Sequence, residues 1–321
     1  MNQSWPEIPF EPWRETCAAL HLYTQVVGKY RLARTPWLNH SWHATLYVNA
    51  RGLTTSLVPD AAGIEIVFDL LSHNVIGEAA DGRRAEIPLG PMSVAEFDAR
   101  FRELVTRLGG SPAFDGRPNE IPDPVPFRDD TEARTYDAAA VTRFFRALVT
   151  IDQVFRRFRT GFLGKASPVH LFWGSFDLAV TRFSGRRAPL HPGGIPALPD
   201  PVTREAYSHE VSSAGFWPGG GGTDFPAFYS YAYPTPNGFA DAPVAPGAAY
   251  FDRTLGEFLL PYDAVRQAAD PEAALMAFLQ SAYQAAAELA GWDRGALECP
   301  IGEPLRPRPV DWTAPETPSS D

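Results

Sequence analysis

The sequence predicts an α+β fold made of two similar units, each a helix, an antiparallel meander and a second helix. Segments that alternate apolar and polar residues occur in two groups, and short glycine-containing turns join them. Segments with apolar residues at helical spacing flank both groups. A proline-rich stretch separates the groups, so we expect a first unit over residues 1–109 and a second over residues 135–295.

The first unit opens with a helix. Residues 11 to about 30 carry apolar side chains at helical spacing, which predicts an amphipathic helix that ends near Gly28. A hairpin follows, because WHATLYVN and LTTSLVP flank a tight turn. Ser93, with Glu96 three residues later, forms a capping box that begins the second helix. The other strands of this meander are expected at residues 64–70, 73–79 and 84–89.

Prolines mark the linker and the tail. Residues 110–134 contain five prolines, which predicts a linker on the surface, and the proline-rich residues 296–321 are expected to form an extended or disordered tail.

The second unit begins with the most regular helix of the chain, whose phenylalanines share one face. Its elements are a helix at 137–162, strands at 169–175, 176–184, 207–217, 227–234 and 256–261, and an Ala-rich helix at 271–292.

Matching landmarks in the two halves raise the question of an internal duplication. The chain has only two lysines, Lys29 and Lys165, and each follows a glycine at the end of a helix. His43 then opens a hairpin in the first half, and His170 opens one in the second. Antiparallel sheets flanked by helices are common, and a lysine at a helix C-terminus is favourable without any function, so both interpretations stay open.

Charge and cysteine content exclude several classes of protein. A net charge of −10 and a pI near 5.2 argue against nucleic acid or anionic lipid as a partner. Cys17 and Cys299 lie at opposite ends of the chain, which excludes a disulfide framework and a CxxC motif. No apolar run approaches the ~18 residues of a membrane span, and no secretory leader is evident, so we expect a cytoplasmic protein.

Histidines are the first candidates for chemistry, because no phosphate loop, HExxH or GxSxG motif is present. His43, His170 and His209 fall at strand candidates, where they could act as acid/base groups or hold a divalent transition metal. Their spacing is not that of a local metal motif, and histidines that are only hydrogen-bonded at a sheet rim are the alternative. Asp177 is expected to orient one of the imidazoles.

Aromatic and arginine residues are the second group of candidates. Trp173 precedes a glycine in the turn of the second hairpin, and Arg182 lies on its return strand. These residues suit a pocket for a small molecule, although a packed core in which Asp177 pairs with Arg182 would look the same. Trp217 lies in a glycine-rich segment that could close as a lid or serve as a plain connection.

The motifs HLFWGSFDLAVTRFSGR and SHEVSSAGFWPG, together with YTQVVGKYRL, resemble a bacterial family known only as a domain of unknown function. The resemblance covers nearly the whole chain except the tail. It implies that the histidine and Gly-Lys segments belong to the common pattern of that family. It implies no reaction, cofactor or partner.

These observations lead to two hypotheses from different classes. In the first, the chain is a cytoplasmic enzyme that acts on a small polar or anionic metabolite at a pocket between the two halves, with metal assistance left open. Lys29, Lys165 and Arg182 would hold the anion, and Trp173 and Trp217 would line the pocket. In the second, the chain is a non-catalytic protein that binds a small molecule or a protein partner. The reaction and the oligomeric state cannot be derived from the sequence.

Overall fold

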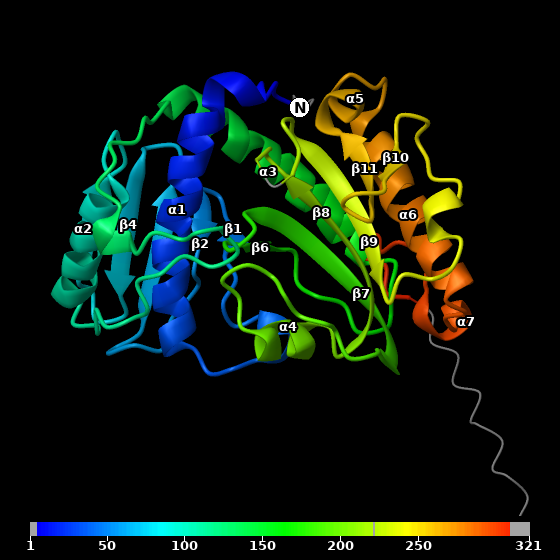
Figure 1. Cartoon of the computed structure of the whole chain (residues 1–321), viewed down its shortest axis with the longest axis horizontal. Helices are drawn as coiled ribbons and strands as arrows, with labels where there is room; N and C mark the ends of the chain where they lie inside the picture. The colour runs from blue at the N-terminus through cyan, green and yellow to red at the C-terminus, as the bar shows by residue number, and fades with distance from the viewer. Residues whose placement is uncertain (1–4, 221, 309–321) are drawn as a thin grey trace, which may run out of the picture.

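The computed structural model describes residues 5–220 and 222–308, and it confirms the α+β class. Two antiparallel sheets lie on either side of the first helix, α1 (Figure 1). None of the helices in these residues combines the length and apolarity needed to cross a bilayer. The α-helices are α1 (Phe10–Arg34), α2 (Val94–Arg107), α3 (Ala138–Arg159), α4 (Asp200–Ala206), α5 (Tyr262–Arg266), α6 (Pro271–Leu289) and α7 (Arg294–Leu297).

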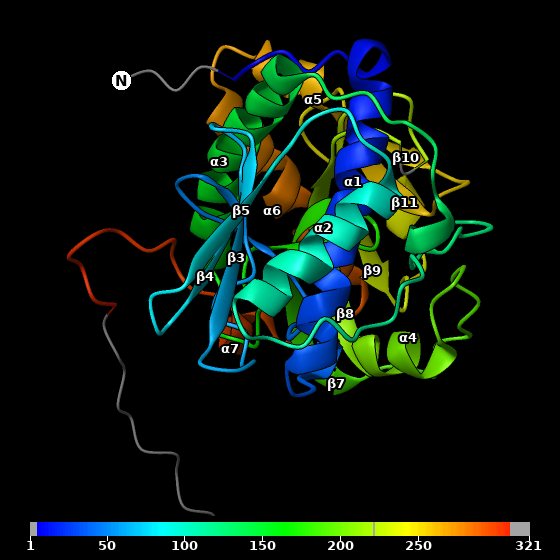
Figure 2. The same ribbon diagram turned by 90° about the vertical axis from the view of Figure 1, so that its left-hand side faces the viewer.

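The first sheet is a meander of five strands in chain order. Its inner face carries buried apolar residues such as Ile66, Phe68 and Val75, and Phe68 stacks on Phe97 of α2. Figure 2 shows α1 and α2 next to each other beside this sheet. Ser93 caps α2 as predicted, because its hydroxyl accepts a hydrogen bond from the backbone N–H of Glu96. The strands are β1 (Tyr47–Val48), β2 (Gly52–Thr54), β3 (Ile64–Asp69), β4 (Asn74–Ala79) and β5 (Arg84–Pro88).

The second sheet has six strands in the order β10-β11-β9-β8-β7-β6, and α3 and α6 pack on one of its faces. It is not a simple repetition of the first sheet, because β11 pairs with β9 and leaves β10 at the edge. An internal duplication is therefore not confirmed. The strands are β6 (His170–Phe172), β7 (Asp177–Arg187), β8 (His209–Trp217), β9 (Ala227–Tyr233), β10 (Tyr250–Asp252) and β11 (Glu257–Pro261).

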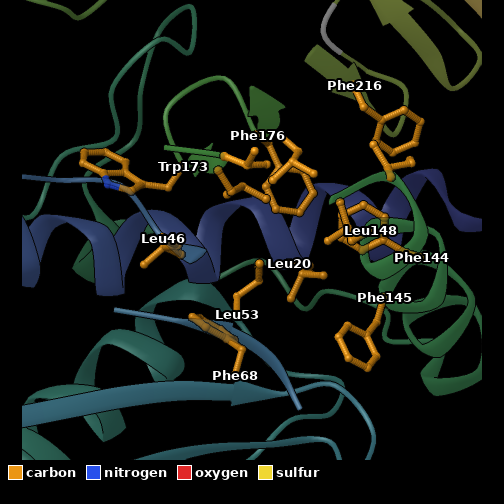
Figure 3. Close-up of a cluster of buried hydrophobic side chains, with 14 of the residues drawn as sticks. Leu20, Leu46, Leu53, Phe68, Phe144, Phe145, Leu148, Trp173, Phe176 and Phe216 are labelled. Atoms are coloured by element: carbon orange, nitrogen blue, oxygen red, sulfur yellow. The ribbon is translucent and has the colours of Figure 1, made fainter. Parts of the chain in front are cut away.

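Helix α1 lies in the centre of the molecule and is not the amphipathic helix that we expected. Every residue from Tyr23 to Arg31 is buried, so no side of this stretch faces solvent. The helix also continues past Gly28, and the indole of Trp173 packs where a side chain at Gly28 would lie. Figure 3 shows Leu20 of α1 among hydrophobic side chains that come from both sheets and from α3.

One hydrophobic cluster extends from Ile8 to Trp292, and backbone hydrogen bonds between Leu46 and Leu171 join the two halves. The expected domain boundaries therefore stay a prediction. Residues 110–134 contain no strand and only a short 3-10 helix, as a linker should. In the expected tail, the backbone N–H of Cys299 donates a hydrogen bond to the carbonyl of Gly161, in the turn after α3. Residues 309–321 of this tail lie outside the described residues.

Candidate functional site

A cavity of about 530 Å³ lies on the face of the second sheet that is turned away from α3 and α6. Strands β7, β8 and β9 form its floor. Its walls come from α1, residues 37–44, the linker residues 115–120 and residues 195–207, which include α4. Both halves of the chain and the linker thus contribute to the cavity, and its volume is in the range that suits a small organic ligand.

Four acidic side chains line this cavity: Asp115 pairs with Lys29, and the other three are Asp177, Glu257 and Glu120. Asp177 begins β7 and is only 4% exposed, Glu257 begins β11, and Glu120 comes from the linker. Among the described residues, none of the three has a Lys or Arg side chain within ion-pair distance. The Asp177 carboxylate instead accepts hydrogen bonds from the hydroxyls of Ser175 and Tyr229. The charge of Asp177 is thus compensated by neutral donors alone.

Burial changes the acidity of these groups. It raises the pKa of Glu120 to about 7, and the negative charge of Asp177 acts in the same direction. Burial likewise raises the pKa of Glu257 to about 8, with smaller contributions from Asp177 and Asp252. The pKa of Asp177 is raised by burial in spite of its two hydroxyl donors. Carboxyl groups that titrate near neutral pH are suited to general acid–base chemistry.

A set of tyrosines surrounds the acidic groups. The ring of Tyr229 crosses β8 over Gly215, where an added Cβ would lie only 2.3 Å from its hydroxyl oxygen, and in this way it reaches Asp177 on β7. Tyr231 lies two residues further along β9, and its hydroxyl lies 2.8 Å from that of Tyr207. Burial raises the pKa of all three phenols, so each remains a neutral hydrogen-bonding group.

Glu120 is held in place by contacts that the linker makes with α1. The side-chain amide of Gln25 donates to the Asn119 carbonyl at 2.9 Å and accepts from the Asn119 N–H at 2.8 Å. The Glu120 backbone then adopts φ +59° and its N–H bonds to Pro196. A Cβ on Gly174 would lie 2.0 Å from Glu120 Oε1, so only glycine leaves room for this carboxyl group.

Four of the residues predicted from sequence line the cavity: Lys29, Trp173, Asp177 and Trp217. The Lys29 ammonium pairs with Asp115 at 2.9 Å, and the Trp173 indole donates to the Ala44 carbonyl at 2.7 Å. Trp217 packs against Tyr229, with ring centroids 4.4 Å apart and ring planes tilted by 30°. The lid that was considered around Trp217 includes residue 221, which lies outside the described residues.

Arg182 faces away from the cavity, contrary to its expected role in holding an anion. Side chains alternate along a strand, so Asp177 and Arg182, five positions apart on β7, point to opposite faces. Arg182 is 1% exposed, and its guanidinium lies 3.6 Å from the ring centroid of Phe158 and 4.3 Å from that of Tyr283. Its position indicates a structural role between the sheet and helices α3 and α6.

The three candidate metal ligands do not share a site. His170 is fully buried beside Thr45, and its pKa is lowered to about 3, chiefly by burial and also by Arg31. His43 lies in a turn before β1 and bonds to Leu38. His209 is the third, and neither it nor the other two line the cavity. The described residues contain no group of three or more His, Cys, Asp or Glu side chains that could hold a metal ion.

Lys165 does not line the cavity but contacts His40, a lining residue that was not predicted from the sequence. Its ammonium lies 2.6 Å from Nε2 of His40, which lines the cavity, and His40 Nδ1 lies 2.7 Å from the Ala206 carbonyl oxygen. The rings of Trp42 and Phe183 also face the Lys165 ammonium. Lys165 therefore positions His40 and does not itself line the cavity.

Comparison with known families agrees with the resemblance noted above. The model of a family of unknown function (DUF5996) matches residues 5–299. The chain belongs to the DUF5996 family. Every element that lines the cavity lies inside the matched residues, so the cavity is part of the DUF5996 domain. No curated protein and no solved structure matches the chain significantly.

Proposed function

We propose that this DUF5996 protein is an enzyme that binds a small organic molecule in the cavity and moves a proton on it with the carboxyl groups of Glu120 and Asp177. The observation that carries the proposal is the enclosure of acidic side chains, without a cationic partner among the described residues, by aromatic walls. A cytoplasmic location remains part of the proposal.

The carboxyl groups of Glu120 and Asp177 would have different roles in the reaction. No hydroxyl, amide or cationic donor from β7 or α1 bonds to the Glu120 carboxyl group. Its pKa of about 7 lets this group give or take a proton near neutral pH. Asp177 is fixed by the Ser175 and Tyr229 hydroxyls, so it supplies a rigid acceptor beside the substrate. Such proton transfer by a positioned side chain contributes about 10²–10⁴-fold to a rate.

The anionic metabolite considered from the sequence gains little support from this lining. Arg182 faces the other side of the sheet, Lys165 lies behind His40, and the charge of Lys29 is matched by Asp115. A polar substrate without a net negative charge fits the cavity better, because an anion would meet Glu120, Asp177 and Glu257.

The second candidate function is binding without catalysis. The indole rings of Trp37, Trp42 and Trp217 favour it, since they line the cavity and are not buried, and so offer an apolar contact surface. Cys17, which could have served as a nucleophile, is buried in the core, where its pKa is raised far above the usual range.

The test is a panel of small metabolites incubated with the full chain, with products detected by mass spectrometry. Glu120→Gln and Asp177→Asn are expected to lower turnover of any substrate found by about 10²–10⁴-fold while the protein stays folded. Glu86→Gln, an exposed glutamate on the first sheet, is the matched control and should leave turnover unchanged. Turnover that survives both cavity substitutions would contradict the proposal, and a retained but never converted ligand would establish the binding alternative.

A further inference from the structure

The cavity has an excess of acidic groups over cations. Its lining includes Glu120, Asp177, Glu257 and Asp115, whereas its only lysine is Lys29, which pairs with Asp115. Arg117 also contributes to the lining, but its residue is exposed at the rim, and His40 is engaged by Lys165. Three carboxyl groups are thus left without a positive partner among the described residues.

One of these carboxyl groups lacks any hydrogen-bond donor at one oxygen. Oε2 of Glu257 is shielded from solvent and has no partner among the described residues, although Glu257 lines the cavity. A buried carboxylate oxygen without a donor is costly, and a cationic N–H group is among the strongest donors that can satisfy it. When Glu257 is ionised, its charge is therefore not compensated by donors of the protein at this oxygen, and a positive charge in the adjacent cavity would be favourable.

The aromatic rings of the lining already hold ammonium groups at two edges of the cavity. The Lys29 nitrogen lies 6.0 Å from the centroid of the Trp173 ring. The Lys165 nitrogen lies 4.9 Å from the Phe183 ring and 5.2 Å from the Trp42 ring. Ring faces attract cations, and between these edges the lining offers further rings beside the unpaired acids.

We infer that the ligand of this cavity is an organic ammonium ion, whose charge is attracted by the carboxylates of Glu120, Asp177 and Glu257 and whose apolar body packs on the aromatic lining that includes Trp217. This inference rests on the proposed function of the cavity as a ligand site. An organic cation is favoured over a metal ion, because no group of three or more potential ligands in residues 5–220 and 222–308 could hold a metal. The volume of about 530 Å³ also exceeds what a bare ion needs.

The experiment compares three probes with the same body: 4-phenylbutylamine, 4-phenylbutan-1-ol and 4-phenylbutanoate. Calorimetric titration of the full chain at pH 8 should show the amine binding at least 10-fold more tightly than the alcohol, with the carboxylate weakest. Choline and its neutral carbon isostere 3,3-dimethylbutan-1-ol extend the comparison to a quaternary ammonium. Quenching of the tryptophans that line the cavity provides a second readout of binding.

Variants test whether the acidic groups cause the preference. Glu257→Gln and Glu120→Gln should each weaken binding of the amine about 10-fold and leave the alcohol unchanged, and Glu86→Gln should change neither. If the alcohol or the carboxylate binds as tightly as the amine, the ammonium inference is overturned while the cavity remains a ligand site. If none of the five probes binds, the inference is also overturned. If, in addition, the Glu120 and Asp177 variants convert metabolites as the unchanged chain does, the proposed function falls as well.

The pH dependence supplies an independent check. A cation prefers the ionised carboxylates, so amine binding should release protons and strengthen as the pH rises from 6 to 8. Glu120 faces Asp177 and Tyr207, while Glu257 faces Asp177, Asp252 and the phenols of β9. The phenols stay neutral throughout this range, so the carboxyl groups account for the release. Amine binding that is independent of pH would contradict the assignment.

Discussion

The two sheets place acidic residues in opposite surroundings. On the outer face of the first sheet, Glu78 and Glu86 flank Arg84 at 3.3 and 3.0 Å, and all three side chains are about half exposed. On the second sheet, Asp177 and Glu257 face an enclosed cavity without a cationic partner in the described residues. The same type of residue is therefore a solvated surface group on one sheet and a buried group with a raised pKa on the other.

What differs is the layer that covers the second face of each sheet. Helices α1 and α2 cover the inner face of the first sheet, and its outer face meets solvent. The second sheet has α3 and α6 on one face, and α1, the linker and α4 enclose the cavity on the other. Helix α1 and the linker precede β6 in the chain, and α4 lies in the connection between β7 and β8, so the site depends on contacts between distant parts of the sequence.

The largest effect is expected from removing one buried ring from either sheet. Phe68→Ala in the first sheet and Phe216→Ala in the second should each lower the free energy of unfolding by about 3–5 kcal/mol. Both rings belong to one hydrophobic cluster, so each variant should shift a single shared transition. Calorimetry and denaturant titration measure this. Two transitions, with only one affected in each variant, would show instead that the sheets unfold independently.

A smaller effect, of opposite sign, is expected at Glu120. Its pKa is about 7 in the folded chain and near the ordinary 4.5 when unfolded, so its contribution to stability is present below pH 4.5 and is lost as the pH rises through 7. Glu120→Gln removes this loss and should stabilise the protein by about 2–3 kcal/mol at pH 8 and hardly at pH 4.5. Melting curves at both pH values test it, with Glu86→Gln as the neutral control on the first sheet.

Alanine substitution of two glycines in central strands distinguishes an effect on packing from an effect on ligand binding. Gly215→Ala would place a Cβ 2.3 Å from the Tyr229 hydroxyl, and Gly77→Ala would place one 2.6 Å from Leu108. Each should cost roughly 1–2 kcal/mol of stability through overpacking. Only Gly215→Ala should also weaken binding of 4-phenylbutylamine, because it displaces Tyr229 from Asp177. Equal effects of the two variants on binding would contradict the claim that Gly215 supports the ligand site by letting Tyr229 reach Asp177.

The smallest effect is expected on the outer face of the first sheet. Arg84→Gln removes the cation between Glu78 and Glu86, and exposed ion pairs of this kind contribute only about 0–1 kcal/mol. Denaturant titration should give a change below about 1 kcal/mol that shrinks further in high salt. A larger loss would mean that these charges do more than keep this face solvated.

Local signals in the sequence were enough to predict α2 and α3. Ser93 and Asp137 cap these helices with their side chains, and both helices show regular apolar spacing. The end of α1 was not predictable from such signals. Gly28 is typical of a helix end, yet it lies inside the helix, where the absence of a side chain leaves room for Trp173, far along the chain. Tertiary packing overrides local propensity at that position.

The candidate site was predicted in part. Alternation along one strand already separates Asp177 from Arg182, so the sequence itself contained the reason why Arg182 could not join the cavity. Glu120 carried no such signal. It lies in a proline-rich linker, and only the contact of Asn119 with Gln25 of α1 brings its carboxyl group to the second sheet. His40 was missed for the same reason, since its partner Lys165 is distant in sequence.

The central position of α1 has a consequence for how the chain is made. This helix leaves the ribosome before the strands of either sheet, but its buried stretch from Tyr23 to Arg31 contacts partners that include Trp173 of the second half. Until the segment around Trp173 has been synthesised, one side of α1 stays uncovered and exposes apolar surface. We therefore expect a nascent chain cut before β6 to be aggregation-prone or held by chaperones, even though the whole first sheet is already present.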